Sequence, residues 1–326
     1  MRRMKGAAGL LTALLLAFQL SAQTFALANE DNGIKVVPVN FTHNGYSYEI
    51  EGVAKSTEGD YQIKSPSRLA ARKLPSAYDP RSSGEITTVK DQASTGACWA
   101  FSALACAEQD LIKKGLENPS AEFSVPALVL SSNSGTATGK DDFSSGGNWL
   151  FAASALANGQ GLCYEDYEPF LESGTENMIV SENKKSVSEY RLNYVMELSS
   201  ITQVKRKIME LGAVSASYFA GNGYMNHNNT AYYDPDASKN TIINHSVTVV
   251  GWDDNYSKDN FRYKPANNGA WLVKGSWGAD QDNDGFYWVS YDEAEFGQFC
   301  CYDFEESCDN TYHYSKMTGY VVNASN

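Results

Sequence analysis

The feature that most constrains the fold is a helix that the sequence predicts to begin at Cys98. Gly96 interrupts the chain just before it, and apolar residues then recur at helical spacing on one face: Phe101, Leu104, Ala105, Leu111 and Ile112. Cys98 therefore lies in the first turn, where unpaired N–H groups and the helix dipole favour an anion. We expect a lowered thiol pKa and a reactive thiolate, although a cysteine at a helix start is often a small buried apolar residue.

The composition is that of an acidic globular protein. The chain has 326 residues, of which 42% are hydrophobic and 20% charged, and its formal net charge is −13. This length allows one large domain or two ordinary ones. The negative charge repels phosphate backbones and anionic lipid headgroups, which argues against nucleic-acid binding. The 6 cysteines do not form CxxC pairs, so we expect no structural zinc and no other cofactor.

The N-terminal residues predict export from the cytoplasm. Residues 1–28 combine a basic start, an apolar stretch over 7–20 and a small-x-small triplet ending at Ala28, which is the pattern of a secretory signal peptide. The apolar stretch is short for a membrane span, so we expect a secreted or cell-surface protein. Residues 29–73 are polar and are expected to form a propeptide or N-terminal arm. Residues 305–326 are expected to form a polar tail or the start of a linker.

Two segments near Cys98 carry a family resemblance. One reads Gln-x5-Cys-Trp-Ala-Phe-Ser, and the other, LPSAYDPR followed by VKDQ, begins at Leu74. They resemble the active-site segment and the mature N-terminus of the papain family of cysteine proteases. The resemblance covers about residues 74–304 and implies a peptidase domain there, released by processing near Lys73 and Leu74. It also implies that Cys98 is the nucleophile and that Gln92, with the Cys98 N–H, forms the oxyanion hole.

A thiol nucleophile needs a base that can hold a proton beside the thiolate. Of the 4 histidines, His245 alone opens a predicted strand, Asn-His-Ser-Val-Thr-Val-Val-Gly-Trp, in which alternation places Ile243, His245 and Val247 on one face. A lone histidine in a strand is ordinarily a packed core residue. Here the segment is similar to the family's histidine strand, which implies that His245 is the catalytic base.

The chain departs from the family at the third catalytic position. The family has an asparagine in an Asn-Ser-Trp-Gly run, whereas this chain has Lys-Gly-Ser-Trp-Gly with Gly275 at that position. The asparagine accepts a hydrogen bond from the imidazole and so fixes its tautomer and direction. Three alternatives are open: a bridging water, a nearby polar side chain such as Asn267 or Asn268, or a freely rotating ring with lower activity. We expect a weakened or differently tuned protease.

The resemblance also implies a substrate groove. Gly146 and Gly147 precede a predicted helix whose apolar residues are Trp149, Ala152, Ala153 and Leu156. Glycines there could simply make the turn. In the family the matching edge lets a substrate backbone pair as an added strand, with Gly147 as the main contact. The pocket for the second residue before the cut is then expected to be lined by Asn148, Trp149, Ile243 and Ser246, and Trp277 to shield the catalytic pair from water.

Two further patterns concern calcium binding and disulfide bonds. Residues 280–285 match the first half of an EF-hand calcium loop, but the twelfth position is Tyr291 in place of a bidentate glutamate, so we expect an ordinary acidic turn. Thr95 and Ser144 replace two cysteines that the family commonly links. Cys106 is expected in the core, and the sequence does not assign disulfide pairs among the remaining cysteines: Cys163, Cys300, Cys301 and Cys308.

Together these observations predict an α+β, two-lobed papain-like fold, with a helical lobe, a β-barrel-like lobe and the active site at the seam. The expected function is that of a secreted cysteine endopeptidase, monomeric and acting on protein or peptide substrates through Cys98, His245 and Gln92. The alternatives are a catalytically impaired binding module or adhesin, favoured by Gly275, and an acyltransferase or amidase that uses the same pair.

Overall fold

The fold is given by a computed structural model. It describes residues 34–43, 46–56, 73–132, 143, 146–157, 162–167, 169–170, 190–221, 223–236, 243–306 and 321–324. The expected signal peptide, together with Ser144 and Cys308, lies outside the described residues. Within these ranges no helix is long and apolar enough to cross a membrane.

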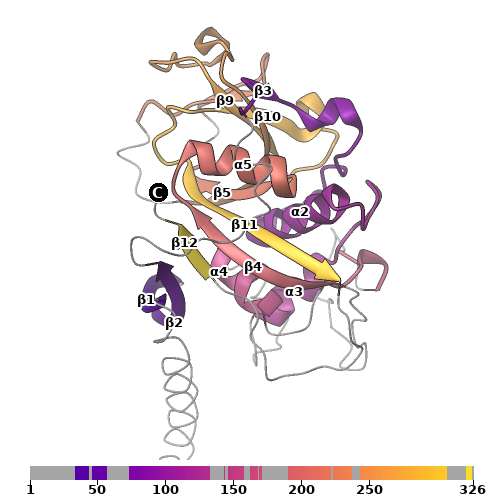
Figure 1. The fold of residues 1–326 in the computed structure, drawn as a ribbon. Helices are drawn as coiled ribbons and strands as arrows, with labels where there is room; N and C mark the ends of the chain where they lie inside the picture. The colour runs from indigo at the N-terminus through magenta and orange to yellow at the C-terminus, as the bar shows by residue number, and fades with distance from the viewer. Residues whose placement is uncertain are drawn as a thin grey trace, which may run out of the picture.

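The described strands form one long open sheet (Figure 1). Their order is β1-β2-β12-β4-β11-β5-β8-β9-β10-β7-β6, and β3 pairs with β8 off this path. Because this order has two separate ends, the expected barrel-like lobe is an open, mostly antiparallel sheet in the described part of the chain. The bounds are β1 Ile34–His43, β2 Tyr46–Ser56, β3 Ala77–Tyr78, β4 Tyr190–Leu198, β5 Val214–Tyr218, β6 Met225–Asn226, β7 Ala231–Tyr232, β8 His245–Asp253, β9 Ala270–Lys274, β10 Phe286–Ser290, β11 Gly297–Glu306 and β12 Val321–Ala324.

The described residues contain helices as well as strands, as expected for an α+β chain. Within the described ranges there are four α-helices: α2 Cys98–Lys113, α3 Val125–Ser132, α4 Trp149–Ala155 and α5 Ile201–Leu211. In Figure 1, α2 lies between the end of the molecule that carries β9 and β10 and the end that carries α3 and α4. Short 3-10 helices span Pro80–Ser83, Glu165–Tyr167, Lys258–Asn260 and Asp282–Gly285.

The predicted helix at Cys98 is confirmed as α2, but its burial exceeds the expectation of one apolar face. Every side chain from Cys98 to Leu111 is buried. The reason is that α2 contacts β8 and β11 of the sheet as well as α3, α4 and α5. Because these elements contact α2 on several sides, the helix cannot rotate about its axis. The position of Cys98 at its start is therefore fixed.

Residues 201–211 form α5, and its two ends follow from the residues that flank it. The Ser200 hydroxyl accepts a hydrogen bond from the N–H of Gln203 and caps the first turn. Gly212 ends the helix with φ 87°, in a region that favours glycine. A Cβ at that position would also lie 2.8 Å from the Gln109 carbonyl oxygen of α2, so the glycine lets α5 approach α2.

Two apolar cores flank the sheet, and β11 serves both. Cys300, Tyr302 and Phe304 belong to the core of the helical half. Cys301 belongs to the core around α5 and β8, with Phe299 packed against it. This alternation follows from the period of two along a strand, whose successive side chains point to opposite faces.

A buried ion-pair network joins the helical half to the sheet. Glu108 of α2 accepts a hydrogen bond from the Thr87 hydroxyl at 2.8 Å and pairs with Lys90 at 3.0 Å. Lys274, at the end of β9, places its Nζ 3.7 Å from the same carboxylate and also donates to Thr87. Nearby Lys90 and Lys274 hold the pKa of Glu108 below its usual value despite burial that would raise it. The network therefore connects the helix that begins at Cys98 with the strand that leads to Gly275.

Candidate active site

Cys98 begins α2, and its sulfur lies among hydrogen-bond donors. The residue is 8% exposed. The N–H groups of Ser246, Trp99 and Cys98 and the Ser246 hydroxyl each lower the pKa of the thiol, but burial raises it by more. The expected lowering is therefore wrong for the resting site, because desolvation of the thiolate outweighs the helix start and the donors. The sequence placed Ser246 in the substrate pocket, whereas the structure places it beside the sulfur.

His245 begins β8, as the sequence predicts, and is enclosed by aromatic rings. Its ring stacks on Trp277 with centroids 4.3 Å apart and an interplanar angle of 7°, while the Tyr218 ring lies 6.0 Å away, edge to face. The residue is 5% exposed, and burial lowers its pKa to about 4. Its Nε2 is buried without a hydrogen-bond partner. Because Ser246 follows it directly and contacts the Cys98 sulfur, the strand start and the helix start meet at one place.

The Gln92 side chain is held in place by two hydrogen bonds. Its amide nitrogen donates to the Thr95 carbonyl at 2.7 Å, and its amide oxygen accepts from the Ser276 hydroxyl at 2.6 Å. The Gln92 backbone N–H also donates to the Ser276 carbonyl at 2.8 Å. An amide nitrogen carries two N–H groups, so the second one is oriented by these contacts. Ser276 is a site residue that sequence reasoning missed, although it stands in the Ser-Trp-Gly run.

Gly275 lies at the position where the family has its asparagine, and the backbone of Gly285 lies close to it. Its N–H donates to the Gly285 carbonyl at 3.1 Å. A Cβ at this position would lie 3.0 Å from that carbonyl oxygen and 3.4 Å from Cε1 of Tyr287. Tyr287 therefore borders the space into which a side chain at position 275 would extend.

The suggested substitutes for the asparagine are engaged elsewhere. The side-chain and backbone N–H groups of Asn267 donate to Asp292, at 3.0 and 2.7 Å. The Asn268 side-chain oxygen accepts from the Lys258 N–H at 3.2 Å. The alternative in which either residue reaches His245 is therefore wrong, because both fix the loop between β8 and β9. The stack on Trp277 likewise opposes a freely rotating ring.

The residues of the expected groove have different structural tasks. Gly146 has φ 72°, which favours glycine. A Cβ at Gly147 would clash with the indole of Trp99, so the residue that follows Cys98 requires a glycine there. The Asn148 side chain caps α4 by accepting from the N–H groups of Leu150 and Phe151. Its oxygen is thus committed to the helix.

The other expected pocket residues lie on two sides of the site. Trp149 packs against the core of the helical half. Ile243 is exposed just before β8, and Trp277 keeps 39% of its surface exposed even though one face covers His245. Trp277 therefore covers one face of the imidazole, while Ile243 is available for contact.

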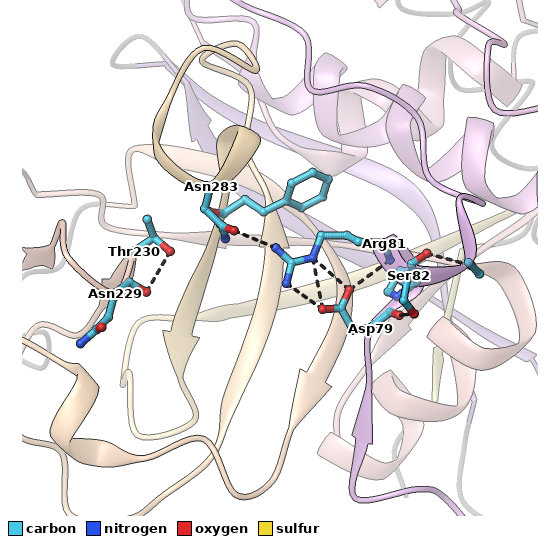
Figure 2. A network of polar contacts seen from close by, with 9 residues as sticks. Asp79, Arg81, Ser82, Asn229, Thr230 and Asn283 are labelled. Carbon is cyan, nitrogen blue, oxygen red and sulfur yellow. Dashed lines mark hydrogen bonds and ion pairs between the residues drawn. The ribbon is translucent and has the colours of Figure 1, made fainter.

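The acidic turn at residues 280–285 is hydrogen-bonded to the 3-10 helix at Pro80–Ser83 (Figure 2). The Arg81 guanidinium donates to the Asp79 carboxylate and, at 3.1 Å, to the Asn283 side-chain oxygen. The same guanidinium lies 5.4 Å from the centre of the Phe286 ring. Asn283 is thus held by a cation of the chain itself. Among the described residues, no group of three or more His, Cys, Asp or Glu side chains is placed to hold a metal ion.

Three other described cysteines lie in the interior. Cys106, Cys300 and Cys301 are buried, and like Cys98 they are free thiols. Burial raises the pKa of Cys106 well above its usual value. Its place in the core agrees with the sequence-based expectation, and its protonated state leaves it a poor nucleophile.

A thiol at a helix start, next to a strand that begins with a buried histidine, is an arrangement typical of cysteine-type hydrolases. Residues 74–312 match the family described as papain family cysteine protease. The chain belongs to this family, whose members are cysteine-type peptidases.

Similar proteins extend this assignment. The chain is 28% identical over 223 residues to procathepsin L of Felis catus, which covers 67% of this chain and 61% of the relative. Among solved structures, the clostridial cysteine protease Cwp84 after propeptide cleavage is 31% identical, with a TM-score of 0.65 over 72% of this chain and 59% of the other. A structure of the protease and lectin-like domains of Cwp84, a surface layer associated protein of Clostridium difficile, is 26% identical, with a TM-score of 0.66 over 91% of this chain and 63% of the other. The chain therefore spans about three-fifths of the length of these proteins.

Proposed function

We propose that this protein is an exported cysteine endopeptidase that cleaves peptide bonds with Cys98 as nucleophile and His245 as acid and base. The observation that carries the proposal is the convergence at the Cys98 sulfur of the Ser246 donors, the helix start and the strand headed by His245. Burial favours the neutral thiol and the neutral imidazole alike. A transfer of the thiol proton to His245 creates both charges together, so that each stabilises the other.

The proposed mechanism has two stages. The Cys98 thiolate attacks the carbonyl carbon, and the resulting oxyanion is stabilised by the Cys98 N–H and the second N–H of Gln92. The C–N bond then breaks as His245 gives its proton to the leaving amine, which leaves an acyl-enzyme thioester. In the second stage His245 takes a proton from water, the hydroxide attacks the thioester, and the carboxylic acid product leaves while the thiol is restored.

The oxyanion assignment gives a prediction for Gln92. We expect Gln92→Ala to lower kcat by about 10²- to 10³-fold with little change in KM, because the donor acts on charge that develops only in the transition state. Ser276→Ala is the matched variant: it keeps the amide but removes the hydroxyl that orients it, so its loss should be smaller. Steady-state kinetics on a fluorogenic peptide measures both. An unchanged kcat in Gln92→Ala would remove Gln92 from the site.

We also propose that residues 1–28 direct export and that the chain is made as a zymogen processed near Lys73 and Leu74. Support comes from hydrogen bonds made by Pro75 and Ser76, which directly follow the proposed cleavage point. The Pro75 carbonyl accepts from the Trp252 indole at 3.2 Å, and the Ser76 carbonyl accepts from the Asp254 N–H at 2.8 Å. The chain is thus tied to β8 directly after the proposed cleavage point. The surface association named for the Cwp84 structure supports a location outside the cell or at its surface.

The proposed activity is tested by covalent labelling. The full chain and its processed form are treated with a peptidyl epoxide, which requires both a nucleophilic thiol and a groove that binds a peptide backbone. We expect one added inhibitor mass on the processed protein and none on Cys98→Ala, measured by intact mass spectrometry. If the folded processed protein takes up no inhibitor, the binding-module alternative replaces the peptidase. Formation of a new amide between the acyl part of a peptide substrate and an added amine would indicate an acyltransferase.

A further inference from the structure

The imidazole of His245 has one nitrogen for which the site described so far supplies no partner. Nε2 is buried without a hydrogen bond, and Gly275 has no side chain that could reach it. A buried polar nitrogen without a partner is costly, and more so once the ring carries a proton. If the ring takes part in catalysis, another group must therefore orient it and balance its charge.

Tyr218 is the residue directly opposite His245 in the sheet. The two are paired in the antiparallel register of β5 and β8, so their side chains lie on the same face. The Tyr218 ring and the imidazole are steeply inclined, with centroids 6.0 Å apart and an interplanar angle of 62°, whereas the Trp277 ring is stacked on the imidazole at 7°. Two rings in two orientations therefore confine the imidazole.

Tyr218 is in turn fixed by Tyr287 of β10. The two hydroxyl oxygens are 2.9 Å apart, and both residues are buried. Burial raises the pKa of both phenols above the ordinary value, so both stay neutral throughout the physiological range. In such a pair one hydroxyl donates to the other, which leaves oxygen lone pairs that can accept a further N–H.

Tyr287 also borders the space that a side chain at position 275 would enter. A Cβ there would lie 3.4 Å from its ring carbon Cε1 and 3.0 Å from the Gly285 carbonyl oxygen. A whole asparagine extends further than a Cβ, so it would compete with the tyrosine ring for the same space. The two positions are thus matched: a glycine at 275 accommodates a large residue at 287.

The same two tyrosines line a cavity of about 380 Å³ that Trp277 also borders. Because Trp277 stacks on His245, this cavity lies next to the rings that enclose the imidazole. A neutral acceptor next to a ring that alternates between neutral and charged states suits the proton transfers of the proposed mechanism.

We propose that Tyr218 and Tyr287 together replace the missing asparagine: they hold the His245 ring against Trp277 and accept the hydrogen bond of its Nε2–H. They are positioning residues, since they act through His245. The tautomer that they favour carries its hydrogen on Nε2 and leaves Nδ1 free to take the Cys98 proton. This inference rests on the proposed function, because it assigns a purpose to His245 as acid and base.

A double-substitution experiment on the full chain tests the matched positions. Tyr287→Phe should lower kcat about tenfold or more with KM within about twofold, since a misdirected base impairs the chemical step. Gly275→Asn alone should also lower kcat, because the asparagine meets the tyrosine ring. In Tyr287→Val the same asparagine has space, so Gly275→Asn in that background should raise kcat. If the kcat losses of Gly275→Asn and Tyr287→Val simply multiply in the double variant, the proposal is overturned.

A second measurement does not depend on activity. In protein labelled with ¹⁵N-histidine, the imidazole shifts of His245 should show a single Nε2–H tautomer, and Tyr287→Phe or Tyr218→Phe should convert it to a mixture. Tyr190→Phe is the matched control, because it removes a buried phenol hydroxyl bonded to the Leu116 carbonyl in the helical half. Unchanged His245 shifts in both variants would refute the assignment. A protein that shows the tautomer but takes up no epoxide would contradict the peptidase while leaving the positioning intact.

Discussion

Cys98→Ala is expected to lower kcat/KM for a peptide substrate by about 10⁴-fold or more, because it removes the atom that forms the acyl-enzyme. The side chain contributes little to the core, since only its sulfur is lost and the helix that it begins is held on all sides. The expected variant is therefore folded and inactive. Kinetics with a fluorogenic peptide, together with circular dichroism, measures both properties.

Cys106→Ala is the matched control for this prediction. Cys106 lies on the same helix and is buried, but its thiol faces the core around Cys300 and Tyr302. We expect a packing loss of about 1 kcal/mol and an unchanged kcat. Activity that persists in Cys98→Ala, or disappears equally in both variants, would mean that the nucleophile is a different group.

Glu108→Ala is expected to lower the free energy of unfolding by about 3–5 kcal/mol. The substitution leaves Lys274, which is almost fully buried, without its carboxylate. Burial already holds the pKa of Lys274 below its usual value, and Glu108 is the nearby charge that opposes this effect most. Urea unfolding at neutral pH measures the loss. A change below about 1 kcal/mol would show that Thr87 alone can satisfy the ammonium.

The paired variant Glu108→Leu with Lys274→Met separates charge from packing. Replacing both ions with apolar side chains of similar volume removes the uncompensated charge, so much of the lost stability should return. Lys90 remains, but it is partly exposed and can turn toward solvent. Because Lys274 leads directly into Gly275, a variant that regains stability without activity would show that the ion pair also helps to place the Ser276 and Trp277 segment.

The sequence predicts local structure well where one strong pattern decides it. The helix that begins at Cys98 and the strand that begins at His245 are both confirmed. Helical spacing, a cap or stop residue and β-branched alternation act within a few residues of each element, so one sequence is enough to find them.

Tertiary surroundings decide the features that the sequence did not predict. The thiol pKa depends on how deeply neighbouring elements bury Cys98, and the barrel-like lobe is an open sheet because of long-range strand order. The partners of His245 were sought among asparagines close in sequence to Gly275. Tyr218 is more than fifty residues from Gly275 in the sequence. It comes next to the imidazole of His245 only through the register of β5 and β8.

The strand β11 carries a consequence for how the molecule can move. Because its alternate side chains complete two cores, neither half keeps an intact interior if the other one loosens. The polypeptide therefore resists division into fragments that fold alone, and the two halves cannot swing apart as independent bodies.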